Sequence, residues 1–182
     1  MRVVSAAEID ETLDFPGLIA ALETALRSDI VVPVRHHHEV VTAGAPATLL
    51  LMPAWSGAGT ADPVLGAKIV TVYPDNAARA LPSVMGSYLL MDGATGAPRA
   101  VLDGARLTLW RTAAASARAA RFLARRDAAQ MLMVGAGALA PFLVRAHASL
   151  RPLADIAIWN RSPGRAGAVV AQLVSEGLPA RL

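Results

Sequence analysis

The segment Met131–Ala140 (MLMVGAGALA) carries the strongest structural signal of the sequence. Four apolar residues run into a glycine turn, and the apolar spacing then becomes helical as far as Leu150. A dinucleotide needs this arrangement, because the first glycine permits a tight turn, the second lets the backbone approach the pyrophosphate, and a small third residue lets the helix pack on the strand. These three positions are Gly135, Gly137 and Ala140. The pattern predicts a strand, a turn and a helix, and the turn is either a nucleotide site or a plain connection.

A second apolar run, Ile156–Trp159, follows the glycines at the spacing of a βαβ unit. Such a unit places its second strand there, followed by the residue that reads the adenosine ribose. An Asp or Glu would bond the 2′-hydroxyl of NAD, whereas Asn160 followed by Arg161 suits a 2′-phosphate. The sequence therefore favours NADP(H), with NAD(H) possible, and leaves open that Arg161 is a solvated loop arginine.

Composition limits the class of protein. The chain has 182 residues, 54% of them hydrophobic, which is enough for one domain or two small ones. No apolar run reaches the roughly 20 residues of a membrane span, and early acidic residues such as Glu8 do not fit a signal peptide, so a soluble cytoplasmic protein is expected. The absence of cysteine excludes disulfides and thiol chemistry. Because the net charge is only +3 and the basic residues are scattered, neither nucleic acid nor a membrane is expected as a partner.

The order of segments predicts an α/β protein in two parts. Residues 5–27 have helical spacing, with Ser5 and Glu8 at the positions of a capping box. Short β-type runs separated by turn residues follow, which predicts a mostly antiparallel sheet. A helical segment from Thr112 to Arg125 then places the domain boundary at Arg126–Asp127, giving domains 1–126 and 127–182. The predicted strands of the first domain are Val31–Val34, Thr48–Met52, Leu65–Tyr73, Ser87–Met91 and Ala100–Leu102.

Two cationic residues of the first part are candidates for chemistry. Lys68 is the only lysine and lies in an apolar strand, where a desolvated ammonium can act as an acid or base; alternatively, it faces water at a strand edge. Arg111 is predicted at the junction of a strand-like run, Leu107–Trp110, and a helix beginning at Thr112. That junction would direct a guanidinium and helix N–H groups at an anion, while the alternative is a surface arginine.

Arg35 is a third candidate, and it precedes the run His36–His38. Adjacent residues of a strand point to opposite faces, and no His, Asp or Glu partner stands at ligand spacing. We therefore expect no metal site in this run.

Several sequence blocks are spaced as in a known family. They continue through the glycine turn to Trp159–Arg161, so the likeness covers essentially the whole chain. The blocks are Gly66–Asn76 (GAKIVTVYPDN), Leu81–Ser83 (LPS), Leu89–Pro98 (LLMDGATGAP), Leu102–Gly104 (LDG) and Leu107–Ala114 (LTLWRTAA). In their order and spacing, they resemble the ornithine cyclodeaminase/mu-crystallin family.

The resemblance implies a homodimer whose N-terminal sheets join, with a Rossmann domain for NAD or NADP. It also implies hydride transfer at C2 of small amino or imino acids, in which Arg35 and Arg111 hold the substrate carboxylate and Lys68 lies beside the reacting carbon–nitrogen bond. The hydride chemistry itself belongs to the nicotinamide. The cofactor positions that the resemblance implies are Ser83, Thr112, Gly135, Gly137, Ala138, Leu139, Asn160 and Arg161.

Two departures from the family pattern bear on activity. Many members have Gln at the position of Leu139 and often His near Phe142, although backbone N–H groups can still hold phosphates without those side chains. The family chain also continues beyond the position of Leu182 with more of the Rossmann sheet and an aspartate used by the cyclodeaminases. We therefore expect an incomplete Rossmann domain in which two strands can be counted.

The predicted function is reduction of a cyclic ketimine, such as Δ1-pyrroline-2-carboxylate, to the corresponding amino acid, here L-proline. This reaction requires carboxylate clamps, a proton donor and NAD(P)H, whereas deamination of ornithine also requires recognition of the distal amine. The alternatives are an ornithine cyclodeaminase, which converts L-ornithine to L-proline and ammonia, and a non-catalytic NADP-dependent binding protein or inactive fragment.

Overall fold

The chain forms two units in the computed structural model, which describes residues 1–182. The first unit comprises Met1–Thr12 and Thr24–Thr108, and the second comprises Leu13–Glu23 and Leu109–Leu182. Helices α2 (Phe15–Arg27) and α3 (Gly104–Leu123) each contribute residues to both units. The predicted boundary at Arg126–Asp127 falls within the second unit, after the end of α3, and stays a prediction.

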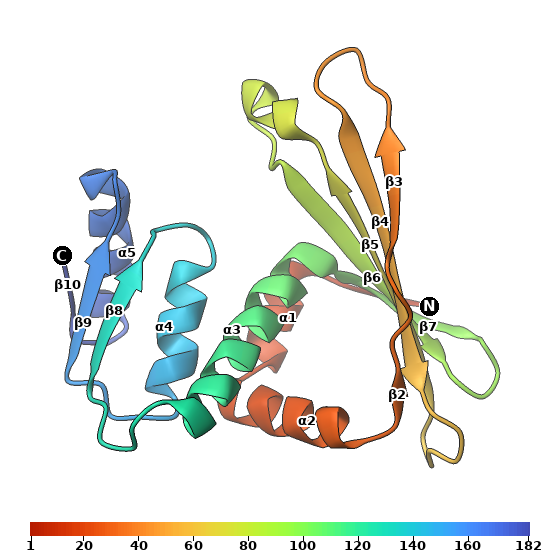
Figure 1. Ribbon diagram of the computed structural model, residues 1–182, viewed down its shortest axis with the longest axis horizontal. Helices are drawn as coiled ribbons and strands as arrows, with labels where there is room; N and C mark the ends of the chain where they lie inside the picture. Colours follow the sequence, from red (N-terminus) through yellow and green to blue (C-terminus); the bar gives the residue numbers. More distant parts are fainter. The chain divides into compact units, whose positions relative to one another are not determined.

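Seven strands form the sheet of the first unit. They are β1 (Arg2–Val4), β2 (Ile30–Val31), β3 (His36–Val40), β4 (Ala47–Ser56), β5 (Val64–Val72), β6 (Val84–Asp92) and β7 (Pro98–Asp103). Their order is β1-β7-β6-β5-β4-β2, with β3 also paired to β4 (Figure 1). Only the pair of β1 and β7 is parallel, so the prediction of a mostly antiparallel sheet is confirmed.

One predicted strand is largely wrong. The ladder of β2 stops at Val31, and the chain has no regular structure from there to Arg35. Pro33 explains the break, because proline has no N–H group to donate to a ladder. Pairing resumes in β3, where the histidine run that was not predicted as a strand lies against Leu49–Leu51 of β4.

Local hydrogen bonds fix the start of two helices. In α1 (Ala6–Thr12), the Ser5 amide donates to Glu8 Oε2 at 2.8 Å and the Glu8 amide donates to Ser5 Oγ at 3.3 Å, which confirms the capping box. Asp103 Oδ1 accepts from the Arg106 amide at 2.7 Å and so caps α3 at its first turn. The strand-like interpretation of Leu107–Trp110 is therefore wrong, because these residues already belong to α3.

The first turn of α3 lies very close to the sheet. A Cβ added at Gly104 would lie 2.8 Å from the carbonyl carbon of Gly86 in β6, so only glycine permits this approach. A short 3-10 helix, η1 (Pro74–Arg79), follows β5 and leads toward β6. These features hold the beginning of α3 against the face of the central strands.

The second unit contains a three-stranded parallel sheet. Its strands β8 (Gln130–Val134), β9 (Asp155–Trp159) and β10 (Ala180–Arg181) are ordered β10-β9-β8 and joined by α4 (Ala140–Ala148) and α5 (Pro163–Ser175) (Figure 1). The predicted strand, turn and helix at Met131–Ala140 and the strand at Ile156–Trp159 are confirmed. We expected two strands, but the structure has three. The third, β10, follows Pro179 and has only two residues, which is too short a run to show apolar periodicity.

Both helices cover one face of this sheet. Val144 of α4 and Leu173 of α5 pack with Ile156 and Ile158 of β9 in one buried cluster. A second cluster joins α2, α3 and α4, in which the Trp110 ring lies 4.5 Å from that of Phe15 and 5.7 Å from that of Phe142. The opposite face of the sheet is exposed at Leu132, Val134 and Trp159. None of the helices combines the length and the apolar character required to cross a membrane.

Candidate active site

Lys68 lies on the middle strand of the antiparallel sheet, directly opposite Met52 of β4 and Tyr88 of β6. The residue is half-buried, and its ammonium donates a hydrogen bond of 2.5 Å to Thr108 Oγ1. The Thr108 hydroxyl donates in turn to the carbonyl of Gly104 in the first turn of α3. Because a hydroxyl is a neutral partner, this contact orients the ammonium without neutralising its charge. The strand-edge alternative for Lys68 does not hold, since β5 is paired on both sides.

Arg35 directly precedes β3. The β3–β4 ladder ends at the pair His36–Leu51, and Arg35 lies outside it, in the segment without regular structure between β2 and β3. Met52, which follows Leu51 in β4, is directly opposite Lys68. The Arg35 side chain is exposed. Arg35 and Lys68 thus both belong to the first unit.

The other residues predicted near the substrate or nicotinamide lie on different elements. Arg111 is exposed and follows Thr108 by three residues along α3. It lies inside the helix, so the predicted use of helix N–H groups at this position is wrong. Thr112 is half-buried one residue further on. Ser83 is half-buried before β6, where its carbonyl accepts from the Tyr73 amide at 2.8 Å.

The glycine turn after β8 has the features of a phosphate cradle. Gly135 has a φ of 110°, a conformation that residues with a Cβ rarely adopt, and its amide donates to the Trp159 carbonyl at 2.7 Å. Gly137 has an ordinary φ, and a Cβ there would meet no atom of the chain within 4 Å. Neither the backbone nor the packing of the chain thus requires glycine at 137, which fits a position kept small for a ligand.

Backbone donors at the same turn point to an anion. The N–H groups from Ala136 to Leu139 have no acceptor within the chain. No side chain caps α4, whose first turn contains Pro141. The donor set therefore fits the pyrophosphate of a dinucleotide, which such turns hold through backbone N–H groups and the positive end of the helix.

Asn160 and Arg161 follow β9 beside this turn, because β8 and β9 are parallel neighbours paired as far as Val134 and Trp159. Asn160 Nδ2 donates to the Ser162 carbonyl at 3.1 Å, which holds the loop, and Arg161 is exposed. The structure therefore brings together the predicted cofactor positions of the second unit: Gly135, Gly137, Ala138, Leu139, Asn160 and Arg161.

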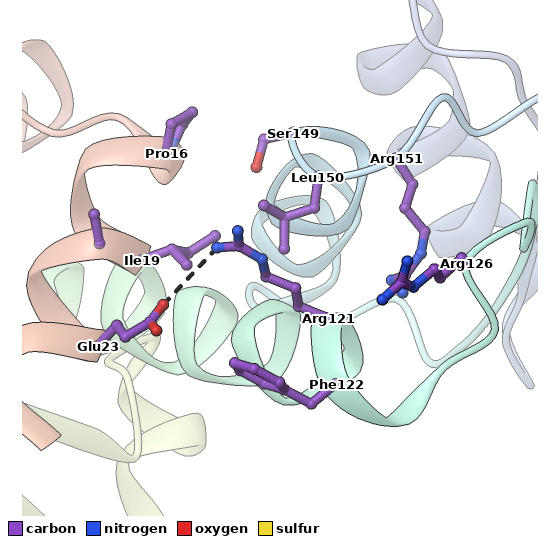
Figure 2. Close-up of a pocket in the computed structure, with 10 residues that line it drawn as sticks. Pro16, Ile19, Glu23, Arg121, Phe122, Arg126, Ser149, Leu150 and Arg151 are labelled. Atoms are coloured by element: carbon purple, nitrogen blue, oxygen red, sulfur yellow. Dashed lines mark ion pairs between the residues drawn. The ribbon is translucent and has the colours of Figure 1, made fainter. Parts of the chain in front are cut away.

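A separate pocket of about 610 Å³ lies in the second unit among α2, α3 and the turn after α4 (Figure 2). It contains none of the predicted site residues. Two of its three arginines have partners within the chain: Arg121 forms an ion pair of 3.8 Å with Glu23, and Arg151 donates to the Ala120 carbonyl at 2.9 Å. These contacts give Arg121 and Arg151 a structural role, because they join helices and occupy carbonyls at the end of α3.

Two neighbours of Lys68 were not singled out from the sequence. Thr108 was quoted only as part of a block, and Tyr88 only as part of a predicted strand. Their proximity to Lys68 depends on the strand register and on the close approach of α3, neither of which a single sequence displays. The histidine run gathers no set of three metal-type ligands; His36 and His38 have ring centroids 6.2 Å apart.

The first unit has a mostly antiparallel sheet with a half-buried lysine, and the second is a parallel β-α-β-α-β unit with a glycine turn. This combination defines a class of α/β proteins that include a Rossmann-like domain. A sequence model described as "Ornithine cyclodeaminase/mu-crystallin family" matches residues 1–180. The chain belongs to this family, which confirms the resemblance inferred from the sequence blocks.

Individual relatives agree with this assignment. Protein SAR DEFICIENT 4 of Arabidopsis thaliana is 44% identical over 140 residues, which cover 76% of this chain and 42% of that protein. A Δ1-pyrroline-2-carboxylate reductase of Colwellia psychrerythraea is 30% identical over 174 residues, covering 94% and 54%. The structure of the Thermococcus litoralis Δ1-pyrroline-2-carboxylate reductase with NADH and L-proline matches with a TM-score of 0.87 and 29% identity, covering 99% and 56%. The chain thus spans about half the length of the relatives that it matches.

Proposed function

We propose that the protein is an NAD(P)-dependent reductase that converts a cyclic ketimine such as Δ1-pyrroline-2-carboxylate to its amino acid, L-proline. The observation that carries this proposal is the half-buried ammonium of Lys68 on a strand paired on both sides, oriented by Thr108. Two of the relatives described above are named as reductases of this compound, which supports the same substrate class.

Each cation has a distinct task in the proposed reaction. Arg35 and Arg111 bind the substrate carboxylate, which fixes the ring and neutralises its charge. Lys68 donates a hydrogen bond and then a proton to the imine nitrogen, which makes the adjacent carbon more electrophilic. A reduced nicotinamide supplies the hydride to that carbon, so C=N becomes CH–NH. Thr108 holds the Lys68 ammonium in place for the proton transfer.

We infer that the cofactor is NADP(H), with NAD(H) as the less favoured form. The support is the absence of an acidic residue after β9, where Asn160 is followed by an exposed Arg161 that can reach a 2′-phosphate. An Arg161→Ala variant should bind NADPH about tenfold more weakly while its affinity for NADH stays the same. Arg165→Ala, an exposed arginine of α5, is the matched control and should change neither. Equal loss for both cofactors would contradict the assignment.

We also infer a homodimer formed through the first unit. Its support is the run of exposed apolar side chains in and just after β2, which are Ile30, Val31, Val32 and Val34, the last at 88% exposure. Large apolar residues exposed together indicate a protein interface. Light scattering should give twice the mass of one chain, and a monomer at micromolar concentration would contradict this inference.

The experiment that tests the proposed function compares two assays on the purified protein. The first measures oxidation of NADPH that depends on Δ1-pyrroline-2-carboxylate, and the second measures proline formed from L-ornithine with catalytic NAD. Activity in the first assay is expected. Activity in the second assay alone would replace the reductase with a cyclodeaminase. Cofactor binding without turnover in either assay would favour a binding role.

A further inference from the structure

Tyr88 lies beside Lys68 on the same face of the sheet. The two residues are directly opposite in the antiparallel pair of β5 and β6. Side chains opposite one another in such a pair project from the same face with Cβ atoms about 5 Å apart. Tyr88 is therefore an immediate neighbour of the proposed proton donor.

Gly66 makes room for the phenol of Tyr88. An added Cβ at Gly66 would lie 1.9 Å from the Tyr88 hydroxyl oxygen and 2.6 Å from the ring carbon that bears it. The φ of Gly66 lies outside the left-handed region, so the glycine is required for space and not for backbone conformation. Since Gly66 and Lys68 are two residues apart on one strand, they share a face. The hydroxyl is thus held over Gly66, on the face of the sheet from which Lys68 projects.

The Tyr88 hydroxyl is a donor without an acceptor. It has no hydrogen-bond partner within the chain, although the residue is half-buried. The hydroxyl is not among the buried polar atoms that lack a partner, so it is open to solvent and accessible to a ligand. Burial also raises the pKa of Tyr88, so the phenol stays protonated at neutral pH and remains able to donate.

The place of the hydroxyl shows what this donor faces. The hydroxyl lies over Gly66, two residues from Lys68 on the same strand and the same face. In the proposed function, on which this inference rests, Lys68 meets the imine nitrogen of the substrate ring. The ring atoms next to that nitrogen then lie toward the Tyr88 hydroxyl.

We propose that Tyr88 is a specificity-determining residue whose hydroxyl donates a hydrogen bond to an oxygen carried by the ring of the substrate. The substrate class is accordingly cyclic imino acids that carry a hydroxyl or another oxygen acceptor on the ring. Unsubstituted rings bind without this contact and leave the hydroxyl to water.

Stable product-type ligands test the inference. The inhibition constants of L-proline and of the two 4-hydroxy-L-proline diastereomers are measured against reduction of Δ1-pyrroline-2-carboxylate. The wild-type protein is expected to bind one hydroxylated ligand about three- to tenfold more tightly than L-proline, the effect of one hydrogen bond. Tyr88→Phe removes only the hydroxyl and should abolish that preference while the constant for L-proline stays the same.

Two further variants make the result specific. Gly66→Ala places a methyl group where the phenol lies, so it should abolish the preference although Tyr88 is present. Ser87→Ala is the matched control, because Ser87 pairs with Ile69 and Asp103 and points to the other face of the sheet. A wild-type protein without preference, or a preference that survives Tyr88→Phe, would overturn the role of Tyr88 alone. If the wild-type protein neither reduces the imine nor binds L-proline, the proposed function fails with it.

Discussion

The two units present their proposed sites by different means. In the antiparallel sheet, side chains carry the chemistry, and strand register sets Lys68 opposite Tyr88. At the turn after β8, the backbone provides the site, since the N–H groups from Ala136 to Leu139 are free and Gly137 leaves open space. We therefore expect that a changed side chain at the first site slows the reaction. An added Cβ at the turn of the second unit should instead weaken cofactor binding.

The largest effect is expected at Lys68. Lys68→Met removes the proton donor and should lower kcat by about 10²- to 10⁴-fold, the usual contribution of general acid catalysis. Lys68→Arg keeps the charge but cannot release a proton at neutral pH, so it should be similarly slow. Steady-state kinetics with Δ1-pyrroline-2-carboxylate measures both. Lys68→Met with more than a tenth of the wild-type kcat would show that another group donates the proton.

Gly135→Ala should be the most damaging change to the stability of the second unit. The φ of 110° forces an alanine into a strained conformation, at a cost of about 1–3 kcal/mol in the free energy of unfolding. Gly167→Ala is the matched control: it lies within α5 with an ordinary φ and open space, and should stabilise by about 0.5–1 kcal/mol. Urea denaturation measures both values. Equal changes for the two variants would refute the role assigned to the backbone of Gly135.

Gly137→Ala separates cofactor binding from folding. Because the added Cβ meets no atom of the chain, the melting temperature should stay the same. The methyl group should nevertheless keep the pyrophosphate from the backbone and weaken NADPH binding about tenfold. Calorimetric titration and thermal unfolding of the same preparation provide the two readouts. A destabilised variant with unchanged cofactor affinity would reverse this interpretation.

The smallest effect concerns acid stability of the first unit. Hydrogen bonds from Arg99 and from Thr95 hold the pKa of Asp92 at about 2, below its ordinary 3.8. Since the folded-state pKa is the lower one, the stabilisation is present above pH 3.8 and is lost as the pH falls toward 2. Asp92→Asn should therefore lower the unfolding midpoint at pH 5 slightly and flatten its fall below pH 4. A profile parallel to that of the wild-type protein would show that Asp92 is not involved.

The sequence predicts the second unit more fully than the first. The apolar run, the two glycines and the helical spacing at Met131–Ala140 are local signals, and strand, turn and helix follow them. In the first unit, Pro33 broke a predicted strand, and the cap by Asp103 made helix of a strand-like run. Both errors arose because these apolar segments have only four residues each, too few for their periodicity to distinguish a strand from a helix or a loop.

The arrangement around Lys68 was only partly predictable. The sequence marked Lys68 as unusual because it is a lone lysine in an apolar strand. It could not place Thr108 or Tyr88 beside Lys68, since both contacts depend on pairings between distant segments: α3 against the sheet and β6 against β5. The roles of Arg35 and Arg111 stay predictions that derive from the family resemblance.

The measurement that tests the division between the units most directly is a nicotinamide fluorescence titration of the wild-type protein, Lys68→Met and Gly137→Ala. The account predicts saturable NADPH binding by the wild-type protein, the same affinity for Lys68→Met and about tenfold weaker binding for Gly137→Ala. Absence of binding to the wild-type protein, or equal weakening by both substitutions, would contradict it.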